Sequence, residues 1–429
     1  MKQFDVKMVE EAREHLRDVV KETPLQLHKP LSERYGAKIY LKREDLQVVR
    51  SYKLRGAYNR MRLLTEAEKK RGIVCASAGN HAQGVAFSCK ALKTQGVIYM
   101  PQNTPKQKID RVRTLGGSYV TIELYGDTFD ESFAEAQSVS KKKGMVLVHP
   151  FNDPYVIAGQ GTVGAEIIEQ LSAAGIEKVD TVVVPIGGGG LCAGIGSYLK
   201  SKNPSVKIIG AEPAGAPSMD KALKAGKVVT LEKLDTFVDG AAVRTVGDLT
   251  FQLCKKVLDK LLLVPEGKVC ETMISLYQRD GIVAEPAGAL SIAALEQLKG
   301  ELSSGGGSAS GGKGKTVVCI LSGGNNDISR YPEIIERSLV HQGLKHYFII
   351  NFSQRPGALR RYLNEALGPT DDITLFEYTK KNNRESGPAL VGIELAKKED
   401  LKPLLKRMDA IGMSYELLKT DSPVFKFII

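Results

Sequence analysis

The sequence predicts an α/β protein in which a part built on two parallel sheets is followed by a small βαββαβ domain. Before residue 335, short apolar runs alternate with helical patterns, which is typical of βαβ units. After a boundary at 335–346 the pattern changes to the order βαββαβ. The length of 429 residues also exceeds that of one typical domain. We therefore expect one domain at 1–335 and a second at 340–429.

The composition narrows the class of protein. Apolar residues make up 42% of the chain and charged residues 25%, as in a soluble globular protein. No apolar run approaches the roughly 18–20 residues of a membrane span, and the N-terminus lacks the apolar run of a signal peptide. The six cysteines have no framework spacing, which indicates reduced thiols in a cytoplasm. The net charge of +11 does not predict nucleic-acid binding, because basic and acidic residues are interspersed.

The elements of the first domain follow from the spacing of apolar residues. An amphipathic helix is expected within 1–35, a strand at 38–41, and a helix starting at Gly56. Helices are also expected at 82–92, around 109–115 and at 127–142. Buried strands are expected at 73–76, 97–101, 118–122, 146–148, 181–186, 207–210 and 316–321. These strands suffice for two sheets on either side of a cleft.

Two further segments complete the expected organisation. The Ser/Gly-rich run at 300–315 is expected to form a long flexible surface loop inside the first domain. In the second domain, Arg355-Pro356-Gly357-Ala358-Leu359 opens a helix, with proline near its first turn. A second helix is expected at 401–408. The strands are expected at 347–352, 373–378, 389–395 and 415–418. This order is ferredoxin-like, and a domain without chemical motifs suits a regulatory or assembly role.

A run of four glycines is the strongest local signal. Gly187, Gly188, Gly189 and Gly190 lie between an apolar strand and a helix, where they leave backbone N–H groups uncovered. Such a helix N-terminus is suited to a phosphate, although a plain tight turn is the alternative. No Gly-Lys-Ser/Thr follows, which excludes a P-loop, and the dinucleotide-binding fingerprint is weak here.

Small and polar residues follow two other strands. Ser77-Ala78-Gly79-Asn80-His81 offers exposed N–H groups for a carboxylate and an amide donor at Asn80. We interpret His81, a lone histidine at a helix start, as a structural residue and not as a base. Ser322 closes the strand 316–321, where its hydroxyl can face a heteroaromatic nitrogen. Glu285 either caps the next helix or faces a cleft, since a buried unpaired carboxylate is costly.

The other motifs suggest a role for Lys53. Alone, it is one of sixty basic residues and most simply a surface charge. Together with a phosphate-type glycine turn, Asn80 and Ser322, it supplies the amine in a set of groups suited to a phosphorylated ring cofactor. No metal-ligand pattern can be read from the sequence.

The motifs that carry this chemistry resemble those of the serine/threonine dehydratases. These are fold-type II, or tryptophan-synthase-β-like, pyridoxal-phosphate enzymes, and the resemblance covers about 1–335. It is specific, because four motifs occur in the family's order: 51–57, 77–84, 187–191 and 322–325. The tail is similar, through 355–359, to the ACT-like regulatory domain of biosynthetic threonine dehydratases, in a single copy.

The resemblance implies roles for individual residues. Lys53 would form the Schiff base with pyridoxal 5′-phosphate and take the Cα proton. The ring would be held by Tyr52, which stacks on it, by Asn80 at its hydroxyl and by Ser322 at its nitrogen. The phosphate would be held by Gly187, Gly188, Gly189, Gly190 and Leu191. The substrate carboxylate would be received by Ser77, Ala78, Gly79, Asn80 and His81. Relatives often have phenylalanine in place of Tyr52, which keeps the aromatic face.

The resemblance also implies an activity. It predicts β-elimination from L-threonine, giving 2-oxobutanoate and ammonia in the first step of isoleucine synthesis, with L-serine as a second candidate substrate. Isoleucine and valine would act as effectors at the tail, and a homo-oligomer, a dimer or tetramer, is expected. Alternatives are a catabolic dehydratase or a serine racemase, with Ser77 available as a second acid. A non-catalytic amino-acid sensor is disfavoured by the intact Lys53.

Overall fold

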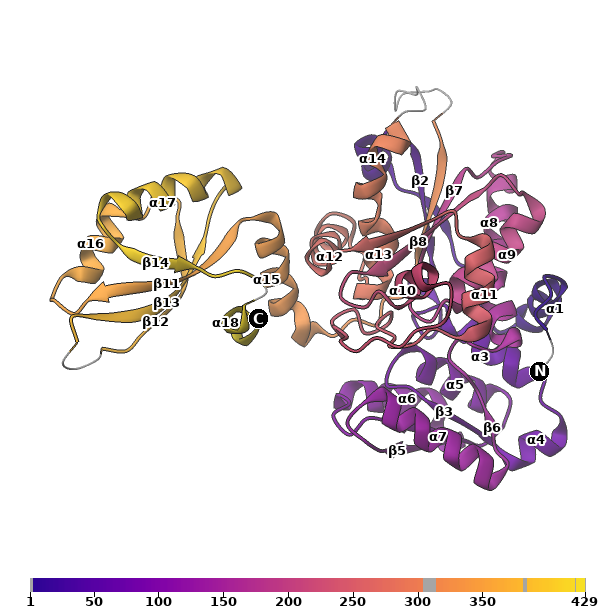
Figure 1. Ribbon diagram of the computed structural model, residues 1–429. Helices are drawn as coiled ribbons and strands as arrows, with labels where there is room; N and C mark the ends of the chain where they lie inside the picture. Colours follow the sequence, from indigo (N-terminus) through magenta and orange to yellow (C-terminus); the bar gives the residue numbers. More distant parts are fainter. Residues whose placement is uncertain (1–2, 304–313, 381–383, 421, 429) are drawn as a thin grey trace. The chain divides into compact units, whose positions relative to one another are not determined.

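The computed structural model describes residues 3–303, 314–380, 384–420 and 422–428 (Figure 1). The chain divides into a first unit and a second unit. The first unit is Met1–Glu266 with Leu276–Asn326, and the second is Gly267–Ser275 with Asp327–Ile429. Of the expected Ser/Gly loop at 300–315, residues 304–313 lie outside the described residues. Among the described residues, no helix combines the length and apolar character that crossing a membrane requires.

A six-stranded sheet forms the centre of the first unit. Its strand order is β1-β2-β10-β7-β8-β9, and every neighbouring pair is parallel except β1 with β2. All residues of β7 and β10 are buried, as expected for central parallel strands. The strands are β1 (Leu25–Leu27), β2 (Lys38–Arg43), β7 (Thr181–Pro185), β8 (Lys207–Pro213), β9 (Lys260–Val264) and β10 (Thr316–Leu321).

A four-stranded parallel sheet forms the rest of the unit, in the order β5-β4-β3-β6. Helices cover both faces of each sheet: α8 and α9 lie opposite α13 on the larger one, and α5 and α6 opposite α7 on the smaller one (Figure 1). The two predicted parallel sheets are thus confirmed. The strands are β3 (Ile73–Ala76), β4 (Gly96–Met100), β5 (Val120–Leu124) and β6 (Val146–Leu147).

Several helices of the first unit lie close to the ranges expected from the sequence. The one carrying Lys53 begins at Lys53 itself, three residues before the expected start at Gly56. The helices are α1 (Lys7–Leu16), α2 (Lys29–Tyr35), α3 (Lys53–Arg62), α4 (Glu66–Arg71), α5 (Asn80–Ala91), α6 (Lys106–Gly116), α7 (Phe129–Lys143), α8 (Pro154–Ala173), α9 (Gly190–Lys202), α10 (Ser218–Ala225), α11 (Asp248–Val257), α13 (Pro286–Ala293) and α14 (Leu295–Ser303). Helix α12 (Glu266–Asp280) is shared, because its residues Gly267–Ser275 belong to the second unit.

Helix α8 is the main element that the sequence pattern missed. It is 20 residues long and buried along most of its length, so it has no polar face to produce a helical period. Glycines let its backbone approach its neighbours: a Cβ on Gly159 would lie 2.5 Å from the Arg55 carbonyl oxygen, and one on Gly161 3.1 Å from that of Gly194. Because of these approaches, α8 supports both α3 and α9.

The second unit has the predicted ferredoxin-like order of elements. Its four strands form an antiparallel sheet in the order β12-β13-β11-β14. Phe348, Ile350 and Phe352 alternate along β11 and are buried in the core of this unit. The elements are α15 (Tyr331–Gln342), β11 (Lys345–Ser353), α16 (Ala358–Glu365), β12 (Asp372–Tyr378), β13 (Ser386–Glu394), α17 (Leu401–Ala410), β14 (Ser414–Leu417) and α18 (Pro423–Ile428).

Candidate active site

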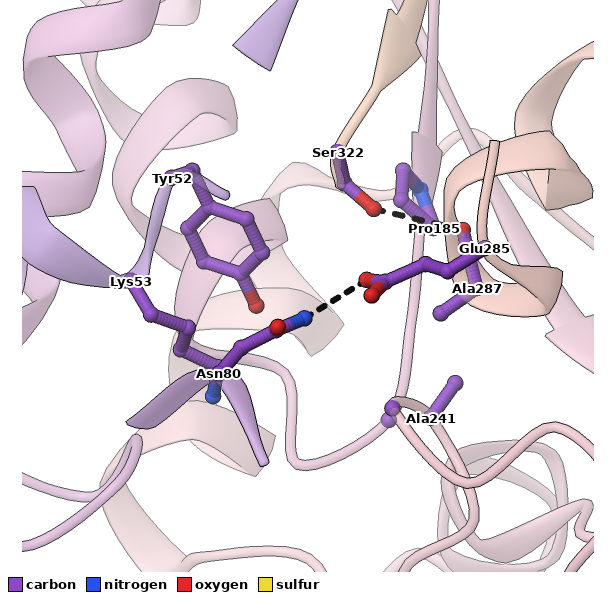
Figure 2. A pocket seen from close by; sticks show the side chains of 10 residues that line it. Tyr52, Lys53, Asn80, Pro185, Ala241, Glu285, Ala287 and Ser322 are labelled. Atoms are coloured by element: carbon purple, nitrogen blue, oxygen red, sulfur yellow. Dashed lines mark hydrogen bonds between the residues drawn. The ribbon is translucent and has the colours of Figure 1, made fainter. Parts of the chain in front are cut away.

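A cavity lies in the first unit, where the carboxyl ends of β3, β7 and β10 come together. Pro185 ends β7, Ser322 follows β10, and Asn80 begins the helix after β3. This is the edge at which open α/β sheets bind ligands. Figure 2 shows the side chains of the lining: Tyr52, Lys53, Asn80, Pro185, Gly187, Gly240, Ala241, Glu285, Ala287 and Ser322.

Lys53 is the amine of this cavity. It is the first residue of α3, and its Nζ donates to the Pro150 carbonyl oxygen at 3.0 Å. Burial lowers the pKa of Lys53 to about 8, while the negative charge of Glu285 acts in the opposite direction. A substantial fraction of this amine is therefore neutral near physiological pH.

The segment before Lys53 is tied to the end of β10. Ser51 forms an antiparallel bridge with Gly323, and the Tyr52 backbone N–H donates to the Ser322 carbonyl oxygen at 3.2 Å. The Tyr52 ring faces the cavity between Lys53 and Ser322 (Figure 2), and Lys53 Nζ lies 5.5 Å from the ring centroid. These bonds fix the ring and the amine relative to the strand end that carries Ser322.

A chain of three polar side chains crosses the cavity wall. Asn80 donates through Nδ2 to Glu285 Oε1 at 2.6 Å, and its Oδ1 accepts from Asn325 Nδ2 at 2.7 Å. Asn325 Nδ2 also donates to the Val49 carbonyl oxygen at 2.8 Å. Both ends of the Asn80 amide are thereby oriented, and one amide hydrogen is left for a ligand.

Glu285 faces the cavity, which decides between the two interpretations of this residue. It precedes α13, but its side chain makes no capping hydrogen bond. Burial, with a contribution from Asp239, raises the pKa of Glu285 to about 7. Figure 2 shows its carboxyl group directed toward Asn80. The cavity thus holds two groups, Lys53 and Glu285, that titrate near neutral pH.

The glycine turn joins β7 to the N-terminus of α9. Gly189 has a φ of 88°, a backbone conformation that side chains disfavour. A Cβ on Gly187 would lie 2.8 Å from the Ala241 backbone, and one on Gly188 2.3 Å from the Phe151 ring. Gly187 lines the cavity, whereas Leu191 lies in the hydrophobic core behind the turn. The turn thus reaches the cavity wall through Gly187, and the glycines after it leave the N-terminus of α9 without side chains.

Ser322 and the 77–81 loop occupy two other walls. Ser322 is 2% exposed, and its hydroxyl donates to the Ala287 carbonyl oxygen at 3.2 Å. The Ser77 hydroxyl accepts from the Gly79 N–H at 3.1 Å. A Cβ on Gly79 would meet no atom within 4 Å, so open space adjoins this loop. Of the loop residues 77–81, Asn80 lines the cavity and the others stand beside it.

The backbone holds the ring of His81, which we interpret from the sequence as a structural residue. Its Nε2 donates to the Val148 carbonyl oxygen at 2.9 Å. Burial and the nearby Lys53 charge lower the pKa of His81 to about 3, so the ring is neutral and cannot serve as a cation near neutral pH. In the described part of the chain, no cluster of three or more His, Cys, Asp or Glu residues is arranged to hold a metal ion.

Some lining residues were missed from the sequence. Gly240 and Ala241 belong to a segment without regular structure between α10 and α11, where no period identifies a site. Ala287 is the second residue of α13, the helix that follows Glu285. For Glu285 the available signal was a lone carboxylate among small apolar residues at a helix start. Ser77, Ala78, Gly188, Gly189, Gly190 and Leu191 belong to the surrounding frame and not to the cavity wall.

Comparison with protein families identifies both parts of the chain. Residues 16–323 match the family described as pyridoxal-phosphate dependent enzyme. Residues 336–428 match the C-terminal regulatory domain of threonine dehydratase. The two matches together cover most of the sequence.

Individual relatives agree with these families. The chain is 52% identical to L-threonine dehydratase biosynthetic IlvA of Halalkalibacterium halodurans, over 97% of each chain. It is also 52% identical to the Bacillus subtilis protein of the same name, over 99% of this chain and 98% of the relative. Among solved structures, threonine deaminase isoform 2 from Solanum lycopersicum has 40% identity and a TM-score of 0.70, covering 78% of this chain and 95% of that one. Maize serine racemase has 30% identity and a TM-score of 0.69, covering 79% and 99%.

Proposed function

The chain belongs to the biosynthetic threonine dehydratases among the pyridoxal-phosphate-dependent enzymes, and we propose that it deaminates L-threonine to 2-oxobutanoate and ammonia. This β-elimination is the first step of isoleucine synthesis. The observation that carries the proposal is the half-buried Lys53 amine, with its pKa lowered to about 8, in a cavity that Asn80, Ser322 and Gly187 also line.

The residues around the cavity fit the cofactor. Gly187–Gly190 leave the N-terminus of α9 free of side chains, which suits a phosphate. We propose that Asn80 donates to the ring hydroxyl and that Ser322 faces the ring nitrogen. The space between Lys53 and Ser322 is bordered by the Tyr52 ring, which offers an aromatic face (Figure 2). When bound, pyridoxal phosphate supplies the electron sink for the charge that develops at Cα.

Lys53 acts as the base in the proposed reaction. Its neutral amine takes the Cα proton of threonine at Nζ, and the lowered pKa makes that neutral form available. The N–H groups of the 77–81 loop, which adjoins open space, are proposed to hold the substrate carboxylate and to orient the Cα–H bond toward Lys53. Ser322 carries no charge and would leave the ring nitrogen unprotonated, which favours elimination over longer-lived carbanion chemistry.

A turnover assay tests this function. The purified enzyme with pyridoxal phosphate is supplied with L-threonine or L-serine, and 2-oxo acid formation is measured. Faster formation of 2-oxobutanoate from threonine is expected. D-serine formed from L-serine without 2-oxo acid would instead indicate a racemase with Ser77 as the second acid. Absence of turnover with both amino acids would contradict the proposal.

We propose that isoleucine and valine bind the second unit as effectors. Gln354 Nε2, Gln354 Oε1 and the Tyr362 hydroxyl are buried and have no hydrogen-bond partner among the described residues. The Tyr362 ring packs 5.4 Å from Phe352, which also lies 6.0 Å from Tyr378. An amino acid offers both donors and acceptors to such atoms, and a branched side chain suits the rings. Titration of threonine turnover with isoleucine and valine tests this regulation, and insensitivity to both would contradict it.

We also propose a homo-oligomer, a dimer or tetramer, located in the cytoplasm. Leu359 and Leu363 lie one turn apart on α16 and are 41% and 43% exposed, which suits a surface covered by a second copy. The six cysteines are free and buried, as in a reducing compartment. Light scattering coupled to gel filtration measures the mass, and cell fractionation locates the protein. A monomer at micromolar concentration would contradict the first part.

A further inference from the structure

A cluster of buried charges lies at the start of the helix that carries Lys53. Arg55, on the first turn of α3, is 1% exposed, and Lys42 on β2 and Glu44 after it are fully buried. Glu166, on α8, completes the cluster, and its side chain is 13% exposed. The cluster contains two cations and two anions, so it is neutral as a whole.

The hydrogen bonds of this charged cluster are complete on the cationic side. Arg55 Nε and Nη2 each donate to one Glu44 oxygen at 2.8 Å. Its Nη1 and Nη2 donate to the Glu166 oxygens at 2.5 and 2.9 Å, and Nη1 also donates to Thr162 Oγ1 at 3.0 Å. All five N–H groups of the guanidinium are therefore used.

Lys42 is satisfied in the same way. Its Nζ donates to Glu166 Oε2 at 2.6 Å, to Gln170 Oε1 at 3.0 Å and to the Thr23 carbonyl oxygen at 2.6 Å. These three bonds account for all the hydrogens of the ammonium group. The charged cluster thus joins β2, the turn after it, α3 and α8 through directional bonds.

Stability alone does not explain such a cluster. Burying four charges carries a desolvation penalty, and apolar side chains of similar size commonly stabilise a core as well or better. What a guanidinium bound to two carboxylates adds is fixed geometry, because its planar fork defines both distance and direction. The benefit of the cluster should therefore be sought in the position of what it holds.

The held element is the first turn of α3. On this turn Gly56 lies so close to α8 that a Cβ there would be 2.3 Å from Gln160 Nε2. Lys53 lies on the same turn, two residues before Arg55. We propose that Arg55, with Glu44 and Glu166, is a positioning residue that locks this turn against α8 and so holds the Lys53 amine in the cavity. The proposal rests on the proposed function only in that Lys53 is the reacting amine.

The test uses Arg55→Lys, which keeps the charge but loses the bidentate geometry. Its control is Arg60→Lys on the same helix, where Arg60 Nε contacts Asp153 Oδ2 at 3.1 Å. The first readout is the pKa of Lys53 in the cofactor-free enzyme. It is measured by NMR of ¹³C-methylated lysines, and the Lys53→Arg variant identifies the Lys53 signal. The second readout is kcat and KM with threonine in the presence of pyridoxal phosphate.

In Arg55→Lys the Lys53 pKa should rise from about 8 toward the ordinary 10.5, since an unlocked turn lets the amine reach water. The kcat should fall roughly ten- to hundredfold with little change in KM, as expected for a misplaced reacting group. Arg60→Lys should change neither. A lower melting temperature with unchanged Lys53 pKa and kcat would show a merely structural cluster and overturn the proposal.

A second variant covers failure of the first to fold. Glu44→Gln with Arg55→Gln replaces one ion pair by two amides and keeps the cluster neutral, with Lys42 and Glu166 still paired. The same rise in the Lys53 pKa is expected, and a wild-type pKa and kcat would overturn the proposal. If the wild-type enzyme did not turn over threonine, the proposed function would fail, while the pKa comparison would still decide the positioning role.

Discussion

Two sets of buried polar side chains differ in how completely they are paired. In the first unit, every N–H of Arg55 and Lys42 has an acceptor, and both ends of the Asn80 amide are bonded. In the second unit, Gln354 and Tyr362 bury polar atoms that have no partner among the described residues. Satisfied networks rigidify a site, whereas unpaired buried groups gain from a ligand that pairs them. Between these two sets the difference suits a preformed catalytic site and a regulatory site that its ligand completes, although Ser51 Oγ, His81 Nδ1 and Gln160 Oε1 of the first unit are also unpaired among the described residues.

Replacement of Lys53 by alanine should have the largest effect and tests the preformed site directly. Lys53→Ala removes both the amine that binds the cofactor and the base. Threonine turnover should fall by at least about a thousandfold, and the visible absorption of the protein-bound cofactor should be lost. Absorbance spectra and 2-oxobutanoate assays measure both. Retention of the spectrum and of activity would show that another amine does the chemistry.

The pH dependence of turnover tests whether burial prepares the Lys53 amine. A base with a pKa of about 8 gains its neutral form as the pH rises from 6 to 8. The kcat for threonine should therefore rise by about tenfold or more over this range and then level off. Buffers of constant ionic strength and a check of stability at each pH serve as controls. A flat profile between pH 6 and 8 would argue against Lys53 as the base.

Glu285, in the wall of the same cavity, gives a prediction with a smaller expected effect. The pKa of Glu285 is about 7 in the folded protein and lies above the ordinary 4.5. Its ionisation therefore destabilises the fold progressively as the pH rises from about 4.5 to about 7. Glu285→Gln should make the cofactor-free protein more stable than wild type at pH 8, by on the order of 1–3 kcal/mol. At pH 4.5 the gain should vanish. Denaturant unfolding at both pH values measures the difference.

The control for Glu285 is Glu123→Gln, an exposed carboxylate on β5. It should leave stability unchanged at both pH values. Equal effects of Glu285→Gln at pH 4.5 and pH 8 would mean that the gain comes from packing and not from the charge.

The smallest effect is expected in the second unit. Because the Tyr362 hydroxyl has no partner in the described residues, Tyr362→Phe should leave the melting temperature of the isoleucine-free enzyme unchanged or raised. Isoleucine should bind about three- to tenfold more weakly, as for the loss of one hydrogen bond. Calorimetric titration of the holoenzyme measures this. The matched control is Tyr415→Phe. The Tyr415 hydroxyl donates to Asp409 at 3.0 Å, and its loss should leave isoleucine binding as in the wild type. A fall in the ligand-free stability of Tyr362→Phe would contradict the contrast between the two sets of side chains.

The contrast also marks what sequence patterns reveal. Central strands such as β7 and β10 are continuous apolar runs, and the residues that follow them, Gly187 and Ser322, meet because parallel strands share one carboxyl edge. Helix α8 was not predicted, because a helix buried on most sides has no hydrophobic period. Strand β9 was not predicted, because a short apolar run does not distinguish a strand from a helix.

Pairing within the site depends on contacts that no local pattern contains. Asn80 and Glu285 are far apart in sequence, and their hydrogen bond exists only once the start of α5 and the residue before α13 come together. The same holds for Arg55 with Glu166. A single charged residue in an apolar context signals that a partner exists, but the topology decides which residue that is.

The place of β10 in its sheet affects how the chain is made. Its Val318 pairs with Tyr40 on one side and Val182 on the other, so the last strand of the unit to be synthesised fills the middle of the sheet. A ribosome delivers the chain N-terminus first, at about 5–20 residues per second. Until Leu321 has emerged, β2 and β7 therefore expose unpaired strand edges, which are prone to aggregation. The smaller sheet, complete by Leu147, can form much earlier. Chaperone binding to the nascent enzyme should accordingly concentrate on β2 and β7 and end when β10 arrives.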